Sequence, residues 1–382
     1  MTIAYFSNFI NHHQVHLSDE LYRLTGGNYY FVETLCMPDW LRKSGYQDYT
    51  SRPYVIKAWE DKLQFDKAMA LALESDVVLF GGVETLPFIK RRAKAKLFSI
   101  EITERRMKRG WINALSPTFL HMMLNYYRYF RKAPFYKLCS SAFGANDEYK
   151  LHAYRGKCYK WGYFTNVDKF DIDASLNDES RYPNSILWCA RFLKLKHPEL
   201  PVLLAHRLKE NGYKFSIDMY GSGSLLENTK RLADKLNVSD CVRFNGNVPN
   251  ALIIDAMRKH TIFLFTSNQK EGWGAVSNEA MSNGCVLVGS NRIGSIPFLI
   301  KDGFNGMVFE SENLDSLYDK VVFLLDHPKE RADMAKNAYL EMCDLWSPAN
   351  AANRLLQLIN DLKNNRDTSF SDGPCSIASP IL

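Results

Sequence analysis

Residues 261–290 read TIFLFTSNQKEGWGAVSNEAMSNGCVLVGS. The stretch opens with a continuous apolar run at 261–267 and closes with a second one at 285–290. Between them, a glycine-rich turn leads into a helical segment that begins near Gly274 and ends at Gly284. Strands that are apolar along their whole length are buried on both faces, so this strand–helix–strand unit predicts a parallel sheet covered by helices.

The same alternation continues on both sides of this unit. In the N-terminal half we predict strands at 2–6, 29–34, 76–82 and 96–101. After residue 184 a second series begins, with strands at 185–192, 214–224 and 241–248 and helices at 225–236 and 250–259. Two consecutive α/β series in a chain of 382 residues predict two Rossmann-like domains.

Polar and turn-forming stretches mark the expected boundaries. The expected segments are an N-terminal domain (1–164), a linker (165–184), a C-terminal domain (185–345), a helix that we expect to pack back on the N-terminal domain (346–364) and a disordered tail (365–382). The linker follows from the polar run VDKFDIDASLNDESRYPN. Disorder of the tail follows from its polar composition and its two prolines.

The composition is that of a globular protein, with 46% hydrophobic and 24% charged residues. The eight cysteines are scattered without a C-x-x-C pair, which argues against a disulfide scaffold and a zinc site. The N-terminus lacks the basic and small-residue features of an export signal, and the longest apolar stretch (112–127) is interrupted by polar residues. We therefore expect a cytoplasmic protein without a spanning helix.

Positive charge is concentrated in one region. Between Lys90 and Lys137 there are 13 lysines and arginines against two glutamates, interleaved with aromatic residues. Three readings of residues 105–137 stay open: a nucleic-acid surface, an interfacial membrane surface with apolar anchors such as Trp111, and a helical subdomain with a solvated basic face. No recognised nucleic-acid-binding module is present, so we do not expect a nucleic-acid partner.

Two glutamates bracket the glycine turn of the opening stretch. Glu271 lies in the loop, Glu279 lies one turn into the helix, and apart from Lys270 no cation stands beside them in the sequence. The first-turn backbone amides, those of Gly274, Ala275 and Val276, are expected to be free to donate to an anion. The alternative is an early-helix carboxylate favoured by the helix dipole, together with an ordinary loop charge.

Two further groups follow predicted strands of the C-terminal domain. Arg191 and Lys196 come directly after the first strand, where two cations suit a diphosphate, although a solvated basic loop is the alternative. Gly221 and Gly223 form a strand-to-helix turn that either receives an anion or is simply tight. That turn lacks the third glycine of a dinucleotide fingerprint, so we expect no NAD binding.

Five motifs in order make the chain resemble a known family. ARFLKLK, MYGSGS, VRFNGNV, EGWGAVSNEAMSNGC and GSIPFLIKDGFNGMVF, spread over residues 185 to about 310, are similar to the C-terminal domain of glycosyltransferase family 4. The resemblance implies a GT-B fold, two facing Rossmann-like domains with an interdomain cleft, and retaining transfer from a nucleotide sugar. It implies that Arg191 and Lys196 bind the diphosphate, that Glu271 contacts the transferred sugar and that Glu279 holds the ribose. His197 departs from the pattern, because a glycine usually follows the lysine.

The N-terminal half resembles bacterial polysaccharide glycosyltransferases in its SNFINHHQ, TERRMKRG and KWGYF segments. The resemblance implies that the loop after the first strand faces sugar and acceptor, which makes Asn11, His12, His13 and Gln14 candidates, with His13 as a catalytic candidate. Glu104 is a further candidate, unless it only forms a salt bridge within its basic neighbourhood. Adjacent histidines do not easily share one metal ion, so acceptor contact or plain loop polarity is the expectation for this loop.

The expected enzyme moves a sugar from a UDP- or GDP-linked donor to a glycan or lipid-linked saccharide, in cell-surface polysaccharide or glycoconjugate synthesis. No metal and no further cofactor are expected, because the D-x-D pair of Asp171 and Asp173 lies in a polar linker without a buried strand beside it.

The choice of the donor's nucleotide base is expected to depend on Asn247, Val248 and residues 266–269. The rivals are a non-hydrolysing nucleotide-sugar epimerase of the same fold and a basic nucleic-acid or membrane-binding module; residues 105–137 are the expected membrane contact, at the inner face.

Overall fold

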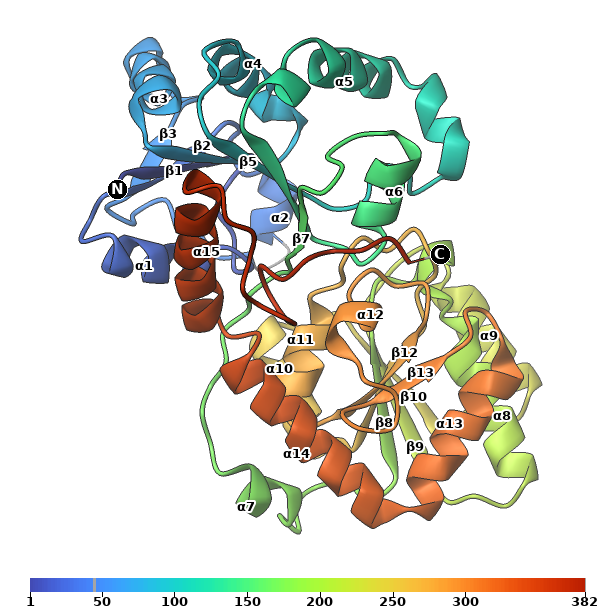
Figure 1. The fold of residues 1–382 in the computed structure, drawn as a ribbon. Coiled ribbons are helices and arrows are strands. Elements are labelled where there is room, and N and C mark those ends of the chain that lie inside the picture. The colour runs from blue at the N-terminus through green and yellow to red at the C-terminus, as the bar shows by residue number, and fades with distance from the viewer. Residues whose placement is uncertain (44–45, 382) are drawn as a thin grey trace. The chain divides into compact units, whose positions relative to one another are not determined.

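The computed structural model describes residues 1–43 and 46–381, which divide into two compact units (Figure 1). Unit 1 comprises Met1–Asn166 and the C-terminal segment from Leu345, and unit 2 comprises Val167–Asp344. Each unit is built on one parallel sheet covered by helices, so the predicted α/β class with two Rossmann-like domains is confirmed.

The sheet of unit 1 has seven strands in the order β3-β2-β1-β4-β5-β6-β7. The strands are β1 (Ile3–Ser7), β2 (Tyr29–Glu33), β3 (Val55–Lys57), β4 (Val77–Phe80), β5 (Ser99–Thr103), β6 (Phe135–Cys139) and β7 (Cys158–Lys160). All neighbouring pairs are parallel. The strand order reverses between β1 and β4, and ligands of such sheets bind at the carboxyl ends beside that reversal.

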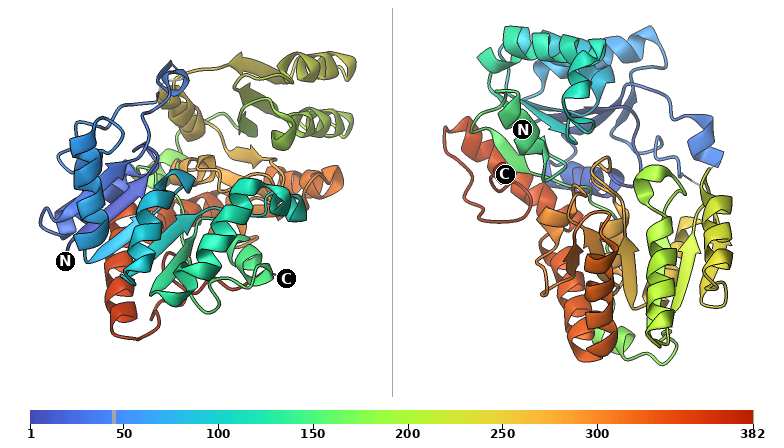
Figure 2. Two further views of the ribbon diagram at one scale, coloured as in Figure 1. Left: turned by 90° about the horizontal axis from the view of Figure 1, so that it is seen from above. Right: turned by 90° about the vertical axis from the view of Figure 1, so that its right-hand side faces the viewer.

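Helices cover both faces of this sheet (Figure 1 and Figure 2). On one face lie α3 (Lys62–Glu74), α4 (Leu86–Lys94) and α5 (Pro117–Arg128), and on the other α1 (Val15–Leu24) packs against α15 (Pro348–Lys363). The shorter elements are α2 (Asp39–Lys43), α6 (Gly144–Lys150), η1 (Val83–Thr85), η2 (Gly110–Leu115) and η3 (Phe130–Lys132). The apolar residues of α3, α4 and α5 form one core with β1, β2 and β4.

The sheet of unit 2 has six parallel strands in the order β10-β9-β8-β11-β12-β13. The strands are β8 (Ser185–Cys189), β9 (Ser216–Tyr220), β10 (Val242–Gly246), β11 (Ile262–Phe265), β12 (Val286–Ser290) and β13 (Met307–Phe309). Its helices are α7 (Ile172–Leu176), η4 (Lys194–Lys196), α8 (Glu199–Glu210), α9 (Leu226–Lys235), α10 (Asn250–Lys259), α11 (Val276–Ser282), α12 (Ile296–Leu299), α13 (Leu314–Asp326) and α14 (Pro328–Asp344). Here the strand order reverses between β8 and β11.

The expected linker is part of unit 2 rather than a free connection. It contains α7, and Tyr339 of α14 packs on Phe170 with a ring separation of 4.6 Å. Arg181 donates to the carbonyl oxygens of His260 and Gly284. Residues 167–184 therefore cover one side of unit 2, because their side chains find partners there.

The tail differs from the prediction of disorder over 365–382. Cys375 is fully buried, and its N–H donates to the carbonyl of Lys160 at 2.8 Å. Tyr159 and Ile377 form an antiparallel bridge, and Tyr159 Oη donates to Asp367 at 3.1 Å. The tail thus pairs with the outer edge of β7, which would otherwise present unpaired backbone groups.

Candidate active site

The loop after β8 holds Lys196 at the carboxyl end of the unit 2 sheet. Lys196 forms an ion pair with Glu271, and its ammonium lies 5.8 Å from the centre of the Phe265 ring. The carbonyl of Lys196 accepts a hydrogen bond of 2.6 Å from Thr266, whose hydroxyl accepts from Trp188 at 2.9 Å. The cationic partner that Glu271 lacks in the sequence is therefore supplied by Lys196 across the strand-order reversal.

His197 keeps the backbone conformation that a glycine would supply. Its φ is +49°, in the left-handed region. Its imidazole contacts Glu199 through Nδ1 at 2.7 Å and Asn268 through Nε2 at 3.0 Å. The contact with Glu199 raises the pKa of His197 above its ordinary value. Because Asn268 N–H also donates to the carbonyl of Leu195 at 3.0 Å, the loops carrying Lys196 and Glu271 are fastened together.

Gly274 begins the turn before α11 and has to be a glycine for two reasons. Its φ is +80°, and an added Cβ would lie 2.2 Å from Cζ of Phe265. Among the residues that the structure describes, the N–H groups of Gly274, Ala275 and Val276 find no hydrogen-bond acceptor. The same Cβ would lie 3.4 Å from Cγ of Glu271, so the turn that carries these three predicted donors begins beside the Lys196–Glu271 pair.

Glu279 lies partly buried on α11 and has an unusual acidity. Burial raises the pKa of its carboxyl to about 7, and the hydrogen bond with the Asn250 side chain opposes that shift. Burial and the nearby Glu279 charge together raise the pKa of the Cys189 thiol to about 12. Glu279 therefore lies between the end of β8 and the start of α10. Asn250 belongs to no motif, so sequence reasoning missed it; Val248 lies two residues before it, in the loop after β10.

The Gly221–Gly223 turn packs tightly on the loop after β8. A Cβ on Gly221 would lie 2.0 Å from the Ala190 carbonyl oxygen, and one on Gly223 would lie 2.6 Å from that of Phe192. Phe192 N–H donates to the carbonyl of Ser222 at 2.9 Å. These contacts explain both glycines by close backbone approach, and an anion-binding role for them stays a prediction.

Arg191 differs from Lys196 in that its side chain is exposed. Within the described part of the chain, its guanidinium has no hydrogen-bond or ion-pair partner. An unpaired cation at the carboxyl end of β8 is available to a ligand, as predicted for a diphosphate contact.

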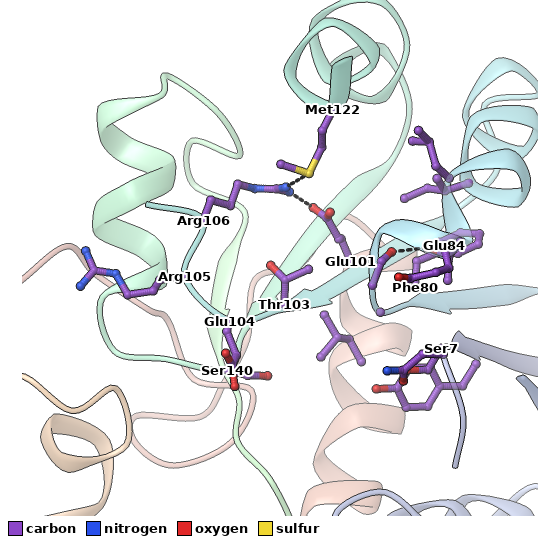
Figure 3. Close-up of a pocket in the computed structure, with 18 of the residues that line it drawn as sticks. Ser7, Phe80, Glu84, Glu101, Thr103, Glu104, Arg105, Arg106, Met122 and Ser140 are labelled. Carbon is purple, nitrogen blue, oxygen red and sulfur yellow. Dashed lines mark hydrogen bonds and ion pairs between the residues drawn. The ribbon is translucent and has the colours of Figure 1, made fainter. Parts of the chain in front are cut away.

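Unit 1 contains a cavity of about 660 Å³ at the carboxyl ends of β1, β4 and β5 (Figure 3). Four of the predicted acceptor-side residues line it, namely Asn11, His13, Gln14 and Glu104. His12 is not in the lining; its ring lies 3.7 Å from that of His13. The loop after β1 and the end of β5, which are almost one hundred residues apart in sequence, therefore build one site.

Several polar atoms of this cavity are buried without a partner. They are His13 Nδ1, Gln14 Oε1, Thr103 Oγ1 and Ser140 Oγ. Burial, with a smaller contribution from His12, lowers the pKa of His13 well below its ordinary value, so its imidazole is neutral at pH 7. A neutral imidazole with a free ring nitrogen can accept a hydrogen bond from a ligand hydroxyl or donate one to it, depending on its tautomer.

Glu104 is held at the rim of the cavity. It forms an ion pair with Lys108 and accepts a hydrogen bond of 2.6 Å from Tyr163 Oη. The other two cations of this segment point elsewhere: Arg105 pairs with Asp147 and Arg106 pairs with Glu148 of α6. Lys108 thus forms the salt bridge with Glu104 that the sequence analysis gave as an alternative role for this glutamate, whereas Arg105 and Arg106 pair with other carboxylates.

A buried cluster of four charges lies behind the cavity. Lys137 is fully buried, with its Nζ 2.9 Å from Glu148 and 3.3 Å from Glu101, and Arg106 pairs with both acids. The two cations keep the pKa of Glu101 near 2 despite its burial. Figure 3 shows Arg106 directed toward Glu101 and Met122. Part of the positive charge counted in this region is therefore neutralised internally.

The D-x-D pair has structural partners. Asp171 caps α7 by accepting from Ala174 N–H at 3.0 Å, and Asp173 lies 2.6 Å from Lys336. Over residues 1–43 and 46–381, no three His, Cys, Asp or Glu side chains gather as they would around a metal ion. None of the described helices is long and apolar enough to cross a membrane.

Comparisons with known proteins show which family the C-terminal part of the chain is similar to. Residues 172–341 match the family described as "Glycosyl transferases group 1". The chain is 24% identical over 213 residues to a GDP-mannose-dependent alpha-(1-6)-phosphatidylinositol monomannoside mannosyltransferase of Mycolicibacterium smegmatis, covering 53% of this chain and 56% of the relative. It is 25% identical over 134 residues to a poly(glycerol-phosphate) alpha-glucosyltransferase of Bacillus subtilis, covering 35% and 19%. The chain thus spans only between about a fifth and about half of the length of these relatives.

Solved structures show the same fold. HepE of Anabaena in complex with UDP superposes with a TM-score of 0.71 at 12% identity, covering 94% of this chain and all of the other. Sucrose-phosphate synthase of Thermosynechococcus elongatus gives a TM-score of 0.69 at 15% identity, covering 96% and 100%. At these identities the likeness shows the GT-B fold alone.

Proposed function

We propose that this chain, whose residues 172–341 form a group 1 glycosyl transferase domain on a GT-B fold, is a retaining glycosyltransferase that moves a sugar from a nucleotide diphosphate sugar to a glycan or lipid-linked saccharide. The observation that carries the proposal is the cluster where β8 and β11 end. There the Lys196–Glu271 pair, the exposed Arg191 and the partly buried Glu279 gather around loops with unpaired amides.

The donor would be bound along this cluster. Arg191 and Lys196 balance the diphosphate, with the amides of Gly274, Ala275 and Val276 as further donors. Glu271 accepts from hydroxyls of the transferred sugar, and Lys196 holds its carboxylate in place. Glu279 accepts from the ribose hydroxyls beside Val248. Binding favours the ionised Glu279, because a carboxylate accepts hydrogen bonds from two hydroxyls more strongly than the protonated acid does.

The proposed reaction needs no carboxylate nucleophile. The bond from the anomeric carbon to the diphosphate oxygen breaks, and a bond to the acceptor oxygen forms on the same face. The acceptor proton passes to the leaving phosphate. The protein's part is to hold both substrates and to stabilise the diphosphate charge with Arg191 and Lys196. Because these cations serve the phosphates, we propose no metal requirement.

The acceptor would bind in the unit 1 cavity. His13, with its neutral imidazole, and Glu104 are the groups that would orient the acceptor hydroxyl. His13 contributes the unpartnered Nδ1, and Glu104 contributes a carboxylate held by Lys108 and Tyr163.

We also propose a peripheral membrane contact within residues 105–137. Large apolar side chains are exposed on η2 and α5: Trp111, Ile112, Leu115, Leu120 and Leu124. Leu115 is 80% exposed, Arg109 directly precedes η2, and Arg128 is the last residue of α5. Apolar anchors next to basic side chains suit an anionic bilayer surface such as the inner face. Trp111→Ser with Leu115→Ser is expected to abolish co-sedimentation with phosphatidylglycerol vesicles, whereas binding unchanged from the wild type would contradict the contact.

A screen of nucleotide sugars tests the proposed function. Thermal stabilisation by UDP or GDP identifies the base, and this stabilisation is expected to be lost in Glu279→Ala. Turnover of the matching sugar nucleotide with candidate acceptors, followed by NMR of the product, is expected to show the anomeric configuration of the donor. Conversion of the sugar nucleotide without any acceptor would support the epimerase instead, and no stabilisation by any nucleotide would refute the proposal.

A further inference from the structure

The cavity of unit 1 has two chemically different parts. One part is polar and is formed by Asn11, His13, Gln14, Thr103, Glu104 and Ser140. The other part is an apolar wall contributed by β4, α4, α5 and η3, and consists of Phe80, Leu86, Ile89, Met122 and Phe130. In Figure 3, Glu104 and Ser140 lie together, while Met122 and Phe80 lie on other sides of the cavity.

The polar part presents hydrogen-bonding groups that the protein does not use. Ser140 is only 2% exposed and its hydroxyl has no partner in the described chain. Three further atoms, Thr103 Oγ1, Gln14 Oε1 and His13 Nδ1, are also buried and have no partner there. A buried polar group without a partner destabilises the protein, because it has lost its hydrogen bonds to water. A hydroxyl-bearing head group at this end would satisfy several of them together.

The five apolar side chains of this wall offer no such partners, although the cavity lining also includes the polar residues Glu84, Thr118 and His121. Arg106, the cation next to Met122, is already engaged with Glu101 and Glu148. A saccharide filling the whole cavity would lose water against this wall without replacing its hydrogen bonds. A hydrocarbon portion would instead bind more tightly in proportion to the apolar surface that it removes from water.

We propose that the acceptor is an amphiphile: a hydroxyl-bearing head group binds the polar part of the cavity, and an apolar portion of the same molecule packs between α4 and α5 against Leu86, Ile89 and Met122. The inference rests on the proposed function, since it assigns the class of acceptor. Helix α5 presents apolar side chains on two faces: Met122 lines the cavity, and Leu124 on the outer face is 68% exposed.

Two alkyl glycosides with the same head group test this inference. Octyl β-D-glucoside, used below its critical micelle concentration, is expected to raise the melting temperature of unit 1 by about 2 °C or more. Methyl β-D-glucoside at equal concentration is expected to have no effect. Ile89→Trp fills the apolar part and is expected to abolish the octyl effect, and the matched control Leu63→Trp, on the exposed side of α3, is expected to retain it.

Stabilisation by UDP and by GDP is measured in every variant, because the nucleoside diphosphate is assigned to unit 2. A cooperative melting transition of unit 1 in Ile89→Trp shows that the substituted unit is folded, and Leu86→Gln, a milder change of the same wall, serves if it is not. Stabilisation by either nucleotide without an octyl effect, or an octyl effect equal in all variants, overturns the amphiphilic acceptor and leaves the proposed function standing. An octyl effect without stabilisation by either nucleotide overturns the acceptor assignment together with the proposed function.

Discussion

The two candidate sites are constructed in different ways. In unit 2 the site consists of several short loop motifs whose backbone is fixed by close approach, as where Gly274 lies against Phe265 and Gly221 lies against Ala190. In unit 1 the site is assembled from segments about one hundred residues apart and is backed by a buried charge cluster around Lys137. The first kind of site is visible in a motif, and the second exists only once the sheet has formed.

The largest expected effect is on the buried cluster of unit 1. Lys137→Met leaves Glu101 and Glu148 with one cation instead of two, and breaking a buried ion pair in this way costs about 3–5 kcal/mol of unfolding free energy. Urea unfolding of the wild type and of Lys137→Met measures this loss of unfolding free energy. Lys209→Met, which removes an exposed pair with Asp240, is the control and is expected to change stability by less than about 1 kcal/mol. Equal losses in the two variants would show that the cluster does not hold unit 1 together.

A pair of glycines tests the backbone argument for unit 2. Gly274 and Gly303 have φ values of +80° and +79°, but an added Cβ meets Phe265 only at Gly274, whereas at Gly303 nothing lies within 4 Å. Gly303→Ala is expected to cost about 1 kcal/mol, from the left-handed backbone alone. Gly274→Ala is expected to cost about 2–4 kcal/mol, because overpacking is added. Equal unfolding free energies would mean that the Phe265 contact is relieved without penalty.

The third prediction concerns the acidity of Glu279. A carboxyl with a folded-state pKa near 7, against an ordinary value of 4.5, binds its proton more tightly when folded, so its contribution to stability is present at low pH and is lost as the pH rises from about 4.5 through 7. Glu279→Gln is therefore expected to be about 1–2 kcal/mol more stable than the wild type at pH 8, and nearly equal to it at pH 5. A stability difference that does not change with pH would contradict the raised pKa.

The smallest effect is expected in the D-x-D pair. Asp173 is largely exposed and pairs with Lys336, so Asp173→Asn is expected to change the unfolding free energy by less than about 1 kcal/mol. The affinity for UDP is measured with and without Mg²⁺ in the wild type and in Asp173→Asn. We expect the same affinity in both proteins and no effect of Mg²⁺ on either. A Mg²⁺-dependent affinity that disappears in the variant would restore the metal reading of this motif.

The two units also differ in how many of their strands could be predicted from the sequence. Five of the six strands of unit 2, β8 to β12, were predicted within a few residues, because β8, β11 and β12 have apolar runs and several of the following turns carry glycines. β13 was not predicted as a strand. The sequence analysis did not predict β6, whose sequence FYKLC contains Lys137. A lysine usually faces solvent, but Lys137 is buried because it forms ion pairs with Glu101 and Glu148, which are distant in sequence. β3 spans three residues and carries little signal.

The candidate sites follow the same division. The motif led to Arg191, Lys196, Glu271 and Glu279, while the contact between Lys196 and Glu271 and the role of Asn250 depend on loops that meet only in the folded unit. The wrong prediction for the tail has a similar cause. Its polar sequence finds partners on β7 that composition cannot reveal.

The central claim is that unit 2 binds a nucleoside diphosphate through Glu279. Calorimetric titration of UDP and GDP at pH 8 into the wild type, Glu279→Gln and the control Glu227→Gln tests it directly; Glu227 is also an early-helix glutamate, but an exposed one on α9. The account predicts one site in the wild type, an unchanged affinity in Glu227→Gln and an affinity at least about 10-fold weaker in Glu279→Gln, as expected for losing hydrogen bonds to a charged group. Equal affinity in all three proteins, or no binding of either nucleotide to the wild type, would contradict it.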